Sequence, residues 1–105
     1  MSSKHELQLR ALMEALPFAS WFKDEKGNFD RVNELLLALL GKEAAQVIGR
    51  SGREVLDGQA AGEHEEAEKE VLKSGETRES TQTKENQFVR SVYFPVTDKK
   101  GNIIG

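Results

Sequence analysis

The sequence predicts an α+β domain with one hydrophobic core, on the strength of three observations. Residues 18–41 (FASWFKDEKGNFDRVNELLLALLG) read as a strand, a turn, a strand and a helix in direct succession. Residues 60–73 carry the longest helical pattern, and residues 76–105 contain three strand-like segments separated by turns. With 105 residues, the chain has the size of one domain that buries a modest core.

Residues 1–17 predict a helix that flanks the domain. Ser3 and Glu6 have the spacing of a capping box, and Pro17 ends the helical pattern. The apolar positions at spacing i, i+3, i+4 and i+7 form one stripe, which consists of Leu9, Leu12, Met13 and Leu16. Two interpretations remain open, since such a stripe either covers the domain's own sheet or also pairs with a second protomer.

Residues 18–41 predict a hairpin followed by a capped helix. Asp24 and Gly27 suit the first and last positions of a tight turn. Asn33 suits the N-cap, where its side-chain oxygen accepts from the first free N–H groups of the helix. Gly41 suits the position just after the helix, where the backbone turns left-handed.

The remainder of the chain predicts short helices and then a second group of strands. In order, the segments are one or two helical turns at 43–47, a helix at 60–73 and strands at 76–84, 88–96 and 102–105. Ser74 and Gly75 end the long helix, on whose apolar face His64 lies. Pro95 indicates that the strand 88–96 ends at a sheet edge or a bulge.

The order of these elements resembles a PAS domain, the small sensory module of signalling proteins. The matching positions of the first hairpin and helix are Trp21, Phe22, Asp24, Gly27, Phe29, Val32, Asn33 and Gly41. A late P-x-x-D-x-x-G-x-x-x-G string, formed by Pro95, Asp98, Gly101 and Gly105, is typical of the family's final hairpin.

The resemblance covers roughly residues 14–105 and implies the PAS fold. That fold is a five-stranded antiparallel sheet with short helices on one face, here with an N-terminal flanking helix (1–17) ahead of the domain (18–105). In the family the last strand usually runs several residues past the final glycine. We therefore expect a truncated last strand and a chain that is a piece of a longer sensor.

Composition excludes several classes of function. A net charge of −3 argues against binding to nucleic acid. The longest unbroken apolar run, residues 35–40, is far shorter than the roughly 20 residues that span a bilayer. We expect a cytoplasmic location and no membrane contact by this fragment. Because the chain has no cysteine, only two histidines and no catalytic motif, we expect neither catalytic nor metal-binding residues.

Single residues indicate whether this chain could use either of two cofactors that occur in PAS relatives. Residues 47–56 (VIGRSGREVL) resemble the segment in which light-sensing relatives carry a flavin-reactive cysteine, but Gly52 stands at that position, which excludes the flavin photochemistry. Haem-binding relatives take their axial histidine from the helix that here contains His64. The glutamates around His64 disfavour haem propionates, so a hydrogen-bonded core or rim histidine is the plainer interpretation and a haem sensor the alternative.

The strand 88–96 has two partly apolar faces, and two arguments choose between them differently. Periodicity alone would bury the more apolar face, whereas the family comparison turns the face of Val89, Ser91 and Tyr93 toward a ligand cavity. Following the family comparison, the candidate ligand pocket consists of Trp21, Phe29, His64, Val71, Val89, Ser91 and Tyr93. The candidate dimer or helix-packing surface consists of Leu9, Leu12, Met13, Leu16, Phe88, Val92 and Phe94. We expect Arg90 to form an exposed ion pair with Glu79 rather than to hold a ligand.

The resemblance implies a sensory domain of a multidomain signal-transduction protein, such as the histidine kinase of a two-component system. We expect a homodimer that binds a small ligand and relays a conformational change to an output domain in the same parent chain. The alternatives are a dimerisation and relay module without a ligand, and a haem-based redox or gas sensor that uses His64. The domain itself is expected to be non-catalytic, the parent being a histidine kinase or a diguanylate cyclase.

Overall fold

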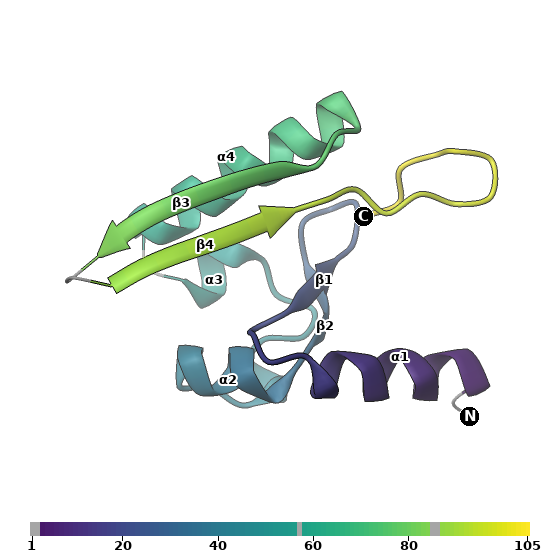
Figure 1. Ribbon diagram of the computed structural model, residues 1–105, viewed down its shortest axis with the longest axis horizontal. Helices are drawn as coiled ribbons and strands as arrows, with labels where there is room; N and C mark the ends of the chain where they lie inside the picture. The colour runs from purple at the N-terminus through teal and green to yellow at the C-terminus, as the bar shows by residue number, and fades with distance from the viewer. Residues whose placement is uncertain (1–2, 57, 85–86) are drawn as a thin grey trace.

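The computed structural model describes residues 3–56, 58–84 and 87–105, with all their side chains except those of residues 59, 60, 82–84 and 87–89. Two β-hairpins and a group of helices make up the fold (Figure 1). The elements are α1 (Lys4–Ala15), β1 (Trp21–Lys23), β2 (Phe29–Val32), α2 (Glu34–Leu40), the 3₁₀-helix η1 (Ala44–Gln46), α3 (Gly52–Val55), α4 (Gly58–Ser74), β3 (Arg78–Lys84) and β4 (Gln87–Tyr93). None of the described helices combines the length and the apolar character needed to cross a bilayer.

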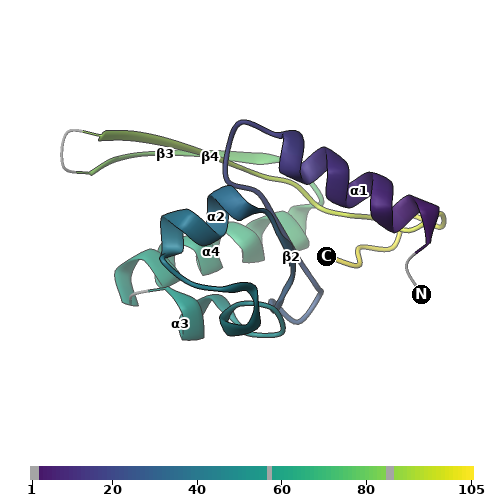
Figure 2. The same ribbon diagram turned by 90° about the horizontal axis from the view of Figure 1, so that it is seen from below.

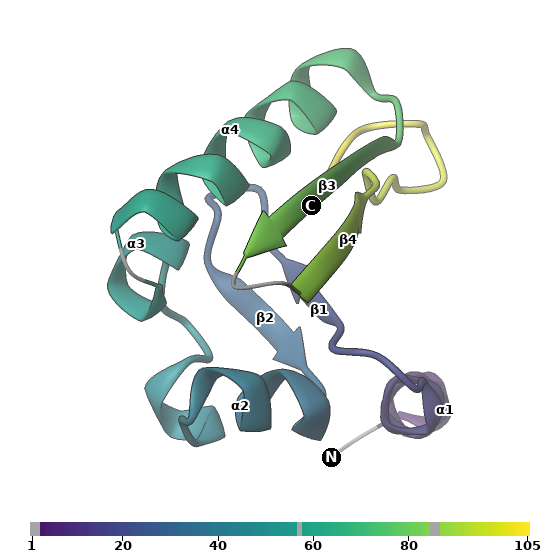
Figure 3. The same ribbon diagram turned by 60° about the vertical axis from the view of Figure 1, so that its left-hand side comes forward.

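Helix α1 begins at the predicted cap, where the hydroxyl of Ser3 accepts a hydrogen bond from the backbone N–H of Glu6 at 3.1 Å. The helix ends at Ala15, two residues before Pro17. Met13 is its buried side chain. Viewed along the axis of α1, the helix lies on the opposite side of the hairpins from α3 (Figure 3).

The first hairpin, β1–β2, has the predicted turn. The carboxylate of Asp24 accepts from the backbone N–H groups of Lys26 and Asn28, and Gly27 has a φ of 87°. Trp21 pairs with Val32, and a bulge follows Phe22. Strand β2 leads directly into Asn33, the N-cap of α2.

Two clusters of buried side chains form the core. The first lies under the first hairpin and consists of Phe29, Leu36, Leu37, Val47 and Val55, with Ala19, Trp21, Val32 and Leu40 packed against it. The second consists of Ala67, Val71 and Tyr93, with Trp21 packed against it. The loop before α3 is attached to β2, because the Phe29 N–H donates to the Arg50 carbonyl at 2.9 Å and the Gly49 N–H donates to the Phe29 carbonyl at 2.8 Å. Helices α2, α3 and α4 therefore gather on one side of the hairpins (Figure 2).

The second hairpin, β3–β4, pairs in register from Arg78 with Tyr93 to Lys84 with Gln87. Strand β4 ends at Tyr93, two residues before Pro95, which cannot donate to a ladder. The described residues thus form two antiparallel sheets of two strands each, and β1 is not hydrogen-bonded to β4.

The expected strand at 102–105 is not formed as a strand, which corrects the predicted count of five. The turn that begins at Asp98 returns the chain to an isolated bridge between Thr97 and Ile103. Val96 is also hydrogen-bonded to the end of this segment. Its N–H donates to the carbonyl of Gly105 at 2.9 Å, and its carbonyl accepts from the N–H of Ile104 at 2.8 Å. Gly105 reaches β1, where a Cβ atom on it would collide with the carbonyl oxygen of Lys23. The segment therefore approaches the space between β1 and β4 without pairing as a ladder with either strand.

Candidate functional site

A cavity of about 740 Å³ opens between the two hairpins and extends over α4 and α2. Six of the seven predicted pocket residues line it, namely Trp21, Phe29, His64, Val71, Ser91 and Tyr93. The side chain of the seventh, Val89, lies outside the described residues. A second hollow of about 710 Å³, between the end of α4 and β3, is more open and contains none of the aromatic residues. The first cavity is therefore the candidate site.

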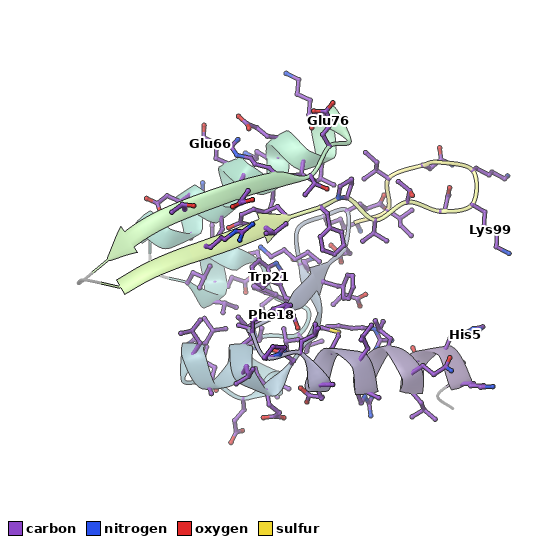
Figure 4. All side chains as sticks on the ribbon, viewed as in Figure 1. His5, Phe18, Trp21, Glu66, Glu76 and Lys99 are labelled. Carbon is purple, nitrogen blue, oxygen red and sulfur yellow. The ribbon has the colours of Figure 1, made fainter. Side chains whose placement is uncertain are left out.

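Three rings from three different elements meet in this cavity. Trp21 comes from β1, His64 from α4 and Tyr93 from β4. The ring centroid of Trp21 lies 6.0 Å from those of both His64 and Tyr93, and the His64 and Tyr93 centroids are 5.7 Å apart, all in edge-to-face geometry. Figure 4 shows Trp21 in the central region of the molecule, between β4 and α2. The rings thus connect two hairpins between which the described residues form no ladder.

His64 and Tyr93 are also joined by a hydrogen bond between Nδ1 of the imidazole and the phenol oxygen. Burial lowers the pKa of His64 from 6.5, although the carboxylate of Glu68 acts in the opposite direction. Burial raises the pKa of Tyr93 above 10.0, against a hydrogen bond from the Ser91 side chain. At neutral pH the imidazole is therefore uncharged and the tyrosine hydroxyl keeps its proton, so the tautomer of His64 decides which of the two groups donates.

A partly buried ion pair lies in the same cavity. Nζ of Lys23, on β1, is 2.7 Å from Oε1 of Glu68, on α4, and the two side chains are 10% and 20% exposed. The same ammonium group lies 4.6 Å from the centroid of the Phe29 ring, within the range of a cation–π contact.

Sequence reasoning missed this ion pair as part of the site, although two signals were present. Lys23 follows Trp21 by two residues on a strand, and Glu68 follows His64 by four on a helix, so each shares a face with a predicted pocket residue. The pairing itself joins residues 45 positions apart, which no local pattern reveals.

The candidate dimer or helix-packing residues are divided between interior and surface. Met13 is buried, Leu9 and Leu16 are half-buried, and Leu12 is 60% exposed. On β4 and just after it, Val92 and Phe94 are exposed and also line the cavity, with Phe94 packing edge-on against Phe22 at 6.3 Å. The side chain of Phe88 lies outside the described residues.

Arg90 is paired with Glu79 across the second hairpin, as expected, with Nε of Arg90 2.6 Å from Oε1 of Glu79. Both side chains are exposed. Arg90 lies at the rim of the cavity, and its charge is already balanced by that glutamate.

The residues around His64 do not fit a haem group. With Nδ1 bonded to Tyr93, iron would have to take Nε2. The imidazole is enclosed edge-on by the rings of Trp21 and Tyr93. Haem requires an open apolar slot beside its axial ligand. In the described part of the chain, no three His, Asp or Glu side chains come together as potential metal ligands.

Comparisons with solved structures find the same fold in several other proteins. The PAS domain of BvgS from Bordetella pertussis superposes with a TM-score of 0.79 at 23% identity, over 97% of this chain and 81% of that one. A domain of an HTR-like protein from Haloarcula marismortui ATCC 43049 matches with a TM-score of 0.61 at 23% identity, over 74% of this chain and 80% of that one. A C-terminal domain from Streptococcus mutans matches with a TM-score of 0.71 at 17% identity, over 94% of this chain and 78% of that one.

The comparison with curated proteins finds no match. A family model described as PAS fold matches residues 13–105, which include both hairpins and all helices after α1. The α+β architecture expected from the sequence is thereby confirmed. This chain belongs to the PAS-fold family.

Proposed function

We propose that this domain is a regulatory sensory module that binds a small ligand in the cavity between its two hairpins. The observation that carries the proposal is the meeting of Trp21, His64 and Tyr93 in a cavity of about 740 Å³. Aromatic walls with a few polar groups suit a small organic molecule, since the rings supply buried area and the polar groups fix its orientation.

The signal would be a change in how the two hairpins lie against α4. In the described residues no strand ladder joins the hairpins, so side chains determine their relative position. Glu68 attaches α4 to the first hairpin through Lys23, and His64 attaches it to the second through Tyr93. A ligand that binds one arrangement of these contacts better than another shifts the population toward it by that difference in affinity.

We place the domain in a multidomain signalling protein, ahead of an output domain such as a histidine kinase or a diguanylate cyclase. The domain acts as a regulator, and catalysis belongs to the output domain. Helix α1 and the segment after β4 lie at the two ends of the described chain and are the routes by which a change in packing would reach a neighbouring domain. This assignment and a cytoplasmic homodimer rest on membership of the family.

A dimerisation and relay module without a ligand is the second candidate. The observation that favours it is a set of exposed apolar side chains on α1 and beside β4, namely Leu12, Val92 and Phe94. Exposed apolar groups of this kind are typical of surfaces that pair with another protein chain.

A ligand screen tests the proposed function against the second candidate. Trp21 is the only tryptophan, so its indole N–H signal in an NMR spectrum and its fluorescence report on the cavity alone. We expect some small metabolites to move this signal and to raise the melting temperature, because a ligand present at 100 times its Kd adds about 2.7 kcal/mol to the free energy of unfolding. His64→Ala should abolish both effects. A complete metabolite screen without a Trp21 response would overturn the ligand proposal and leave the relay module.

The molecules that copurify with the protein provide a second readout. Absorbance spectra and mass spectrometry of extracted small molecules would identify a bound ligand directly. A Soret band lost in His64→Ala would contradict our conclusion that the cavity does not fit haem.

A further inference from the structure

We propose that the ligand of this cavity is a small organic carboxylate, whose carboxylate group replaces Glu68 as the partner of Lys23. This inference rests on the proposed function and names the chemical class of the ligand. It follows from one buried cation, one removable anion and the hydrogen-bond donors around them.

Lys23 is the buried cation. Its side chain is 10% exposed and lines the cavity, and its one described ion pair is with Glu68. The Phe29 ring covers another side of the ammonium group. A charge removed from water to this extent needs an anion beside it, because the lost hydration is not otherwise replaced.

Glu68 is the anion that can leave. Its side chain is twice as exposed as that of Lys23, and its described contact with the lysine uses Oε1 alone. The Glu68 side chain is itself 20% exposed, so its carboxylate has access to water on rotation. The side chain of Lys23 is only 10% exposed, so its ammonium group would require a new anion in place of Glu68. Exchanging one carboxylate for another keeps the net charge of the cavity unchanged.

Several of the surrounding groups are donors and suit a carboxylate, and the other lining carboxylate, Asp24, already accepts from N–H groups of its own turn. Either tautomer of a neutral His64 leaves one donor of the His64–Tyr93 pair available, namely Nε2–H when the hydroxyl donates to Nδ1 and the Tyr93 hydroxyl when Nδ1 donates to it. The indole nitrogen of Trp21 is a donor only, and no hydrogen bond from it is described. The rings of Trp21, Phe29 and Tyr93 provide the apolar walls that an aromatic or branched carboxylate would contact.

Arg90 is the other described cation that lines the cavity, and it serves as the matched control. It lies at the exposed rim and is paired with Glu79 on the other strand of the same hairpin. An anion at Arg90 would be screened by water, whereas an anion at Lys23 would form a charge-assisted contact shielded from water.

The exchange would also explain how binding becomes a signal. The Lys23–Glu68 contact attaches α4 to the first hairpin, so a ligand that takes Lys23 releases this attachment. The His64–Tyr93 contact to the second hairpin would remain.

Benzoate and benzamide, which have the same shape and differ in charge, test the inference. We expect benzoate to shift the Trp21 indole signal and benzamide to bind at least about tenfold more weakly, a difference of about 1.4 kcal/mol. Glu68→Gln should bind benzoate more tightly than the unmodified protein, since it removes the competing carboxylate. Lys23→Met should lose benzoate binding, and Arg90→Gln should keep it.

The outcomes separate the ligand class from the function. Benzamide binding as tightly as benzoate, or weaker benzoate binding by Glu68→Gln, would overturn the carboxylate proposal. If benzoate does not bind while other compounds shift the Trp21 indole signal, the proposed ligand class is wrong and the proposed sensory function stands. If Lys23→Met does not fold, Glu68→Gln still decides, because benzoate should raise its melting temperature more than that of the unmodified protein.

Discussion

The side-chain amide of Asn33 donates a hydrogen bond to the backbone carbonyl of Met13 at 3.0 Å and thereby joins the N-cap of α2 to the last turn of α1. The same amide nitrogen donates to the carbonyl of Phe18 at 2.9 Å. The side-chain oxygen accepts from the backbone N–H groups of Ser20 and Leu36, each at 3.0 Å. Asn33 is 1% exposed, and every hydrogen-bonding capacity of its side chain is used.

We predict that Asn33→Ala lowers the free energy of unfolding by about 3 kcal/mol, because it removes a helix cap and leaves buried carbonyl and N–H groups without partners. Urea denaturation measures the change. Asn102→Ala, at an exposed turn position, is the control and should cost no more than about 0.5 kcal/mol. A cost below about 1 kcal/mol for Asn33→Ala would show that Asn33 does not hold α1 and α2 together.

The pH dependence of stability should report the buried state of His64. Its pKa in the folded protein lies below 6.5 because burial penalises the charged imidazole. At a pH between the pKa of His64 in the folded protein and 6.5, the unfolded chain binds a proton that the folded protein does not. The free energy of unfolding should therefore fall as the pH decreases through about 6.5 and level off once the folded protein is protonated as well.

His64→Asn should remove this slope, since asparagine offers a nitrogen or oxygen near the position of Nδ1 and does not titrate. Urea denaturation between a pH of about 7.5 and about 5.5 covers the window, and the lowered pKa values of Glu65 and Asp98 act only in more acidic solution. His5→Asn, in the exposed first turn of α1, should leave the slope intact. An unchanged slope in His64→Asn would show that another group is responsible.

Two glycine substitutions should have opposite effects on stability. Gly41 ends α2 with a φ of 66°, so Gly41→Ala should cost about 1 kcal/mol of left-handed strain. Gly62 lies within α4, where a Cβ atom would meet nothing within 4 Å. Gly62→Ala should therefore add about 0.5–1 kcal/mol, because alanine loses less backbone entropy in a helix. Thermal unfolding measures both, and equal signs would contradict the assignment of Gly41 as a left-handed helix end.

The parts of the fold that could be predicted from sequence are those fixed by local backbone chemistry. Asp24 with Gly27, and Asn33 with Gly41, each act on N–H or C=O groups within a few residues, so their positions in the sequence specify the turn and the helix ends. The meeting of His64 with Tyr93 followed from the family comparison, because periodicity alone favoured burying the opposite face of β4.

What could not be predicted depends on contacts between distant segments. Lys23 and Glu68 look like ordinary surface charges in the sequence, and only the packing of α4 on β1 places them together. Whether residues 102–105 pair as a strand depends likewise on how closely Gly105 approaches β1. The stripe on α1 predicted a helix correctly, but a single chain does not bury all of it, since Leu12 is exposed.

Self-association should depend on the apolar side chains that this chain leaves exposed on α1 and beside β4. Leu12 is 60% exposed, so Leu12→Glu should change the free energy of unfolding of the monomer by no more than about 0.5 kcal/mol. Phe94 is 55% exposed but packs against Phe22, so Phe94→Glu should cost the monomer about 1 kcal/mol. If a second protomer covers them, each charge would be buried without a partner, and the Kd of the dimer measured by sedimentation equilibrium should rise at least tenfold, or about 1.4 kcal/mol. Ile48→Glu, between η1 and α3, alters an exposed apolar side chain outside the candidate surface and should leave the Kd unchanged. Equal weakening by all three variants would point to general hydrophobic association, and no weakening by Leu12→Glu or Phe94→Glu would remove α1 and the segment after β4 from the dimer interface.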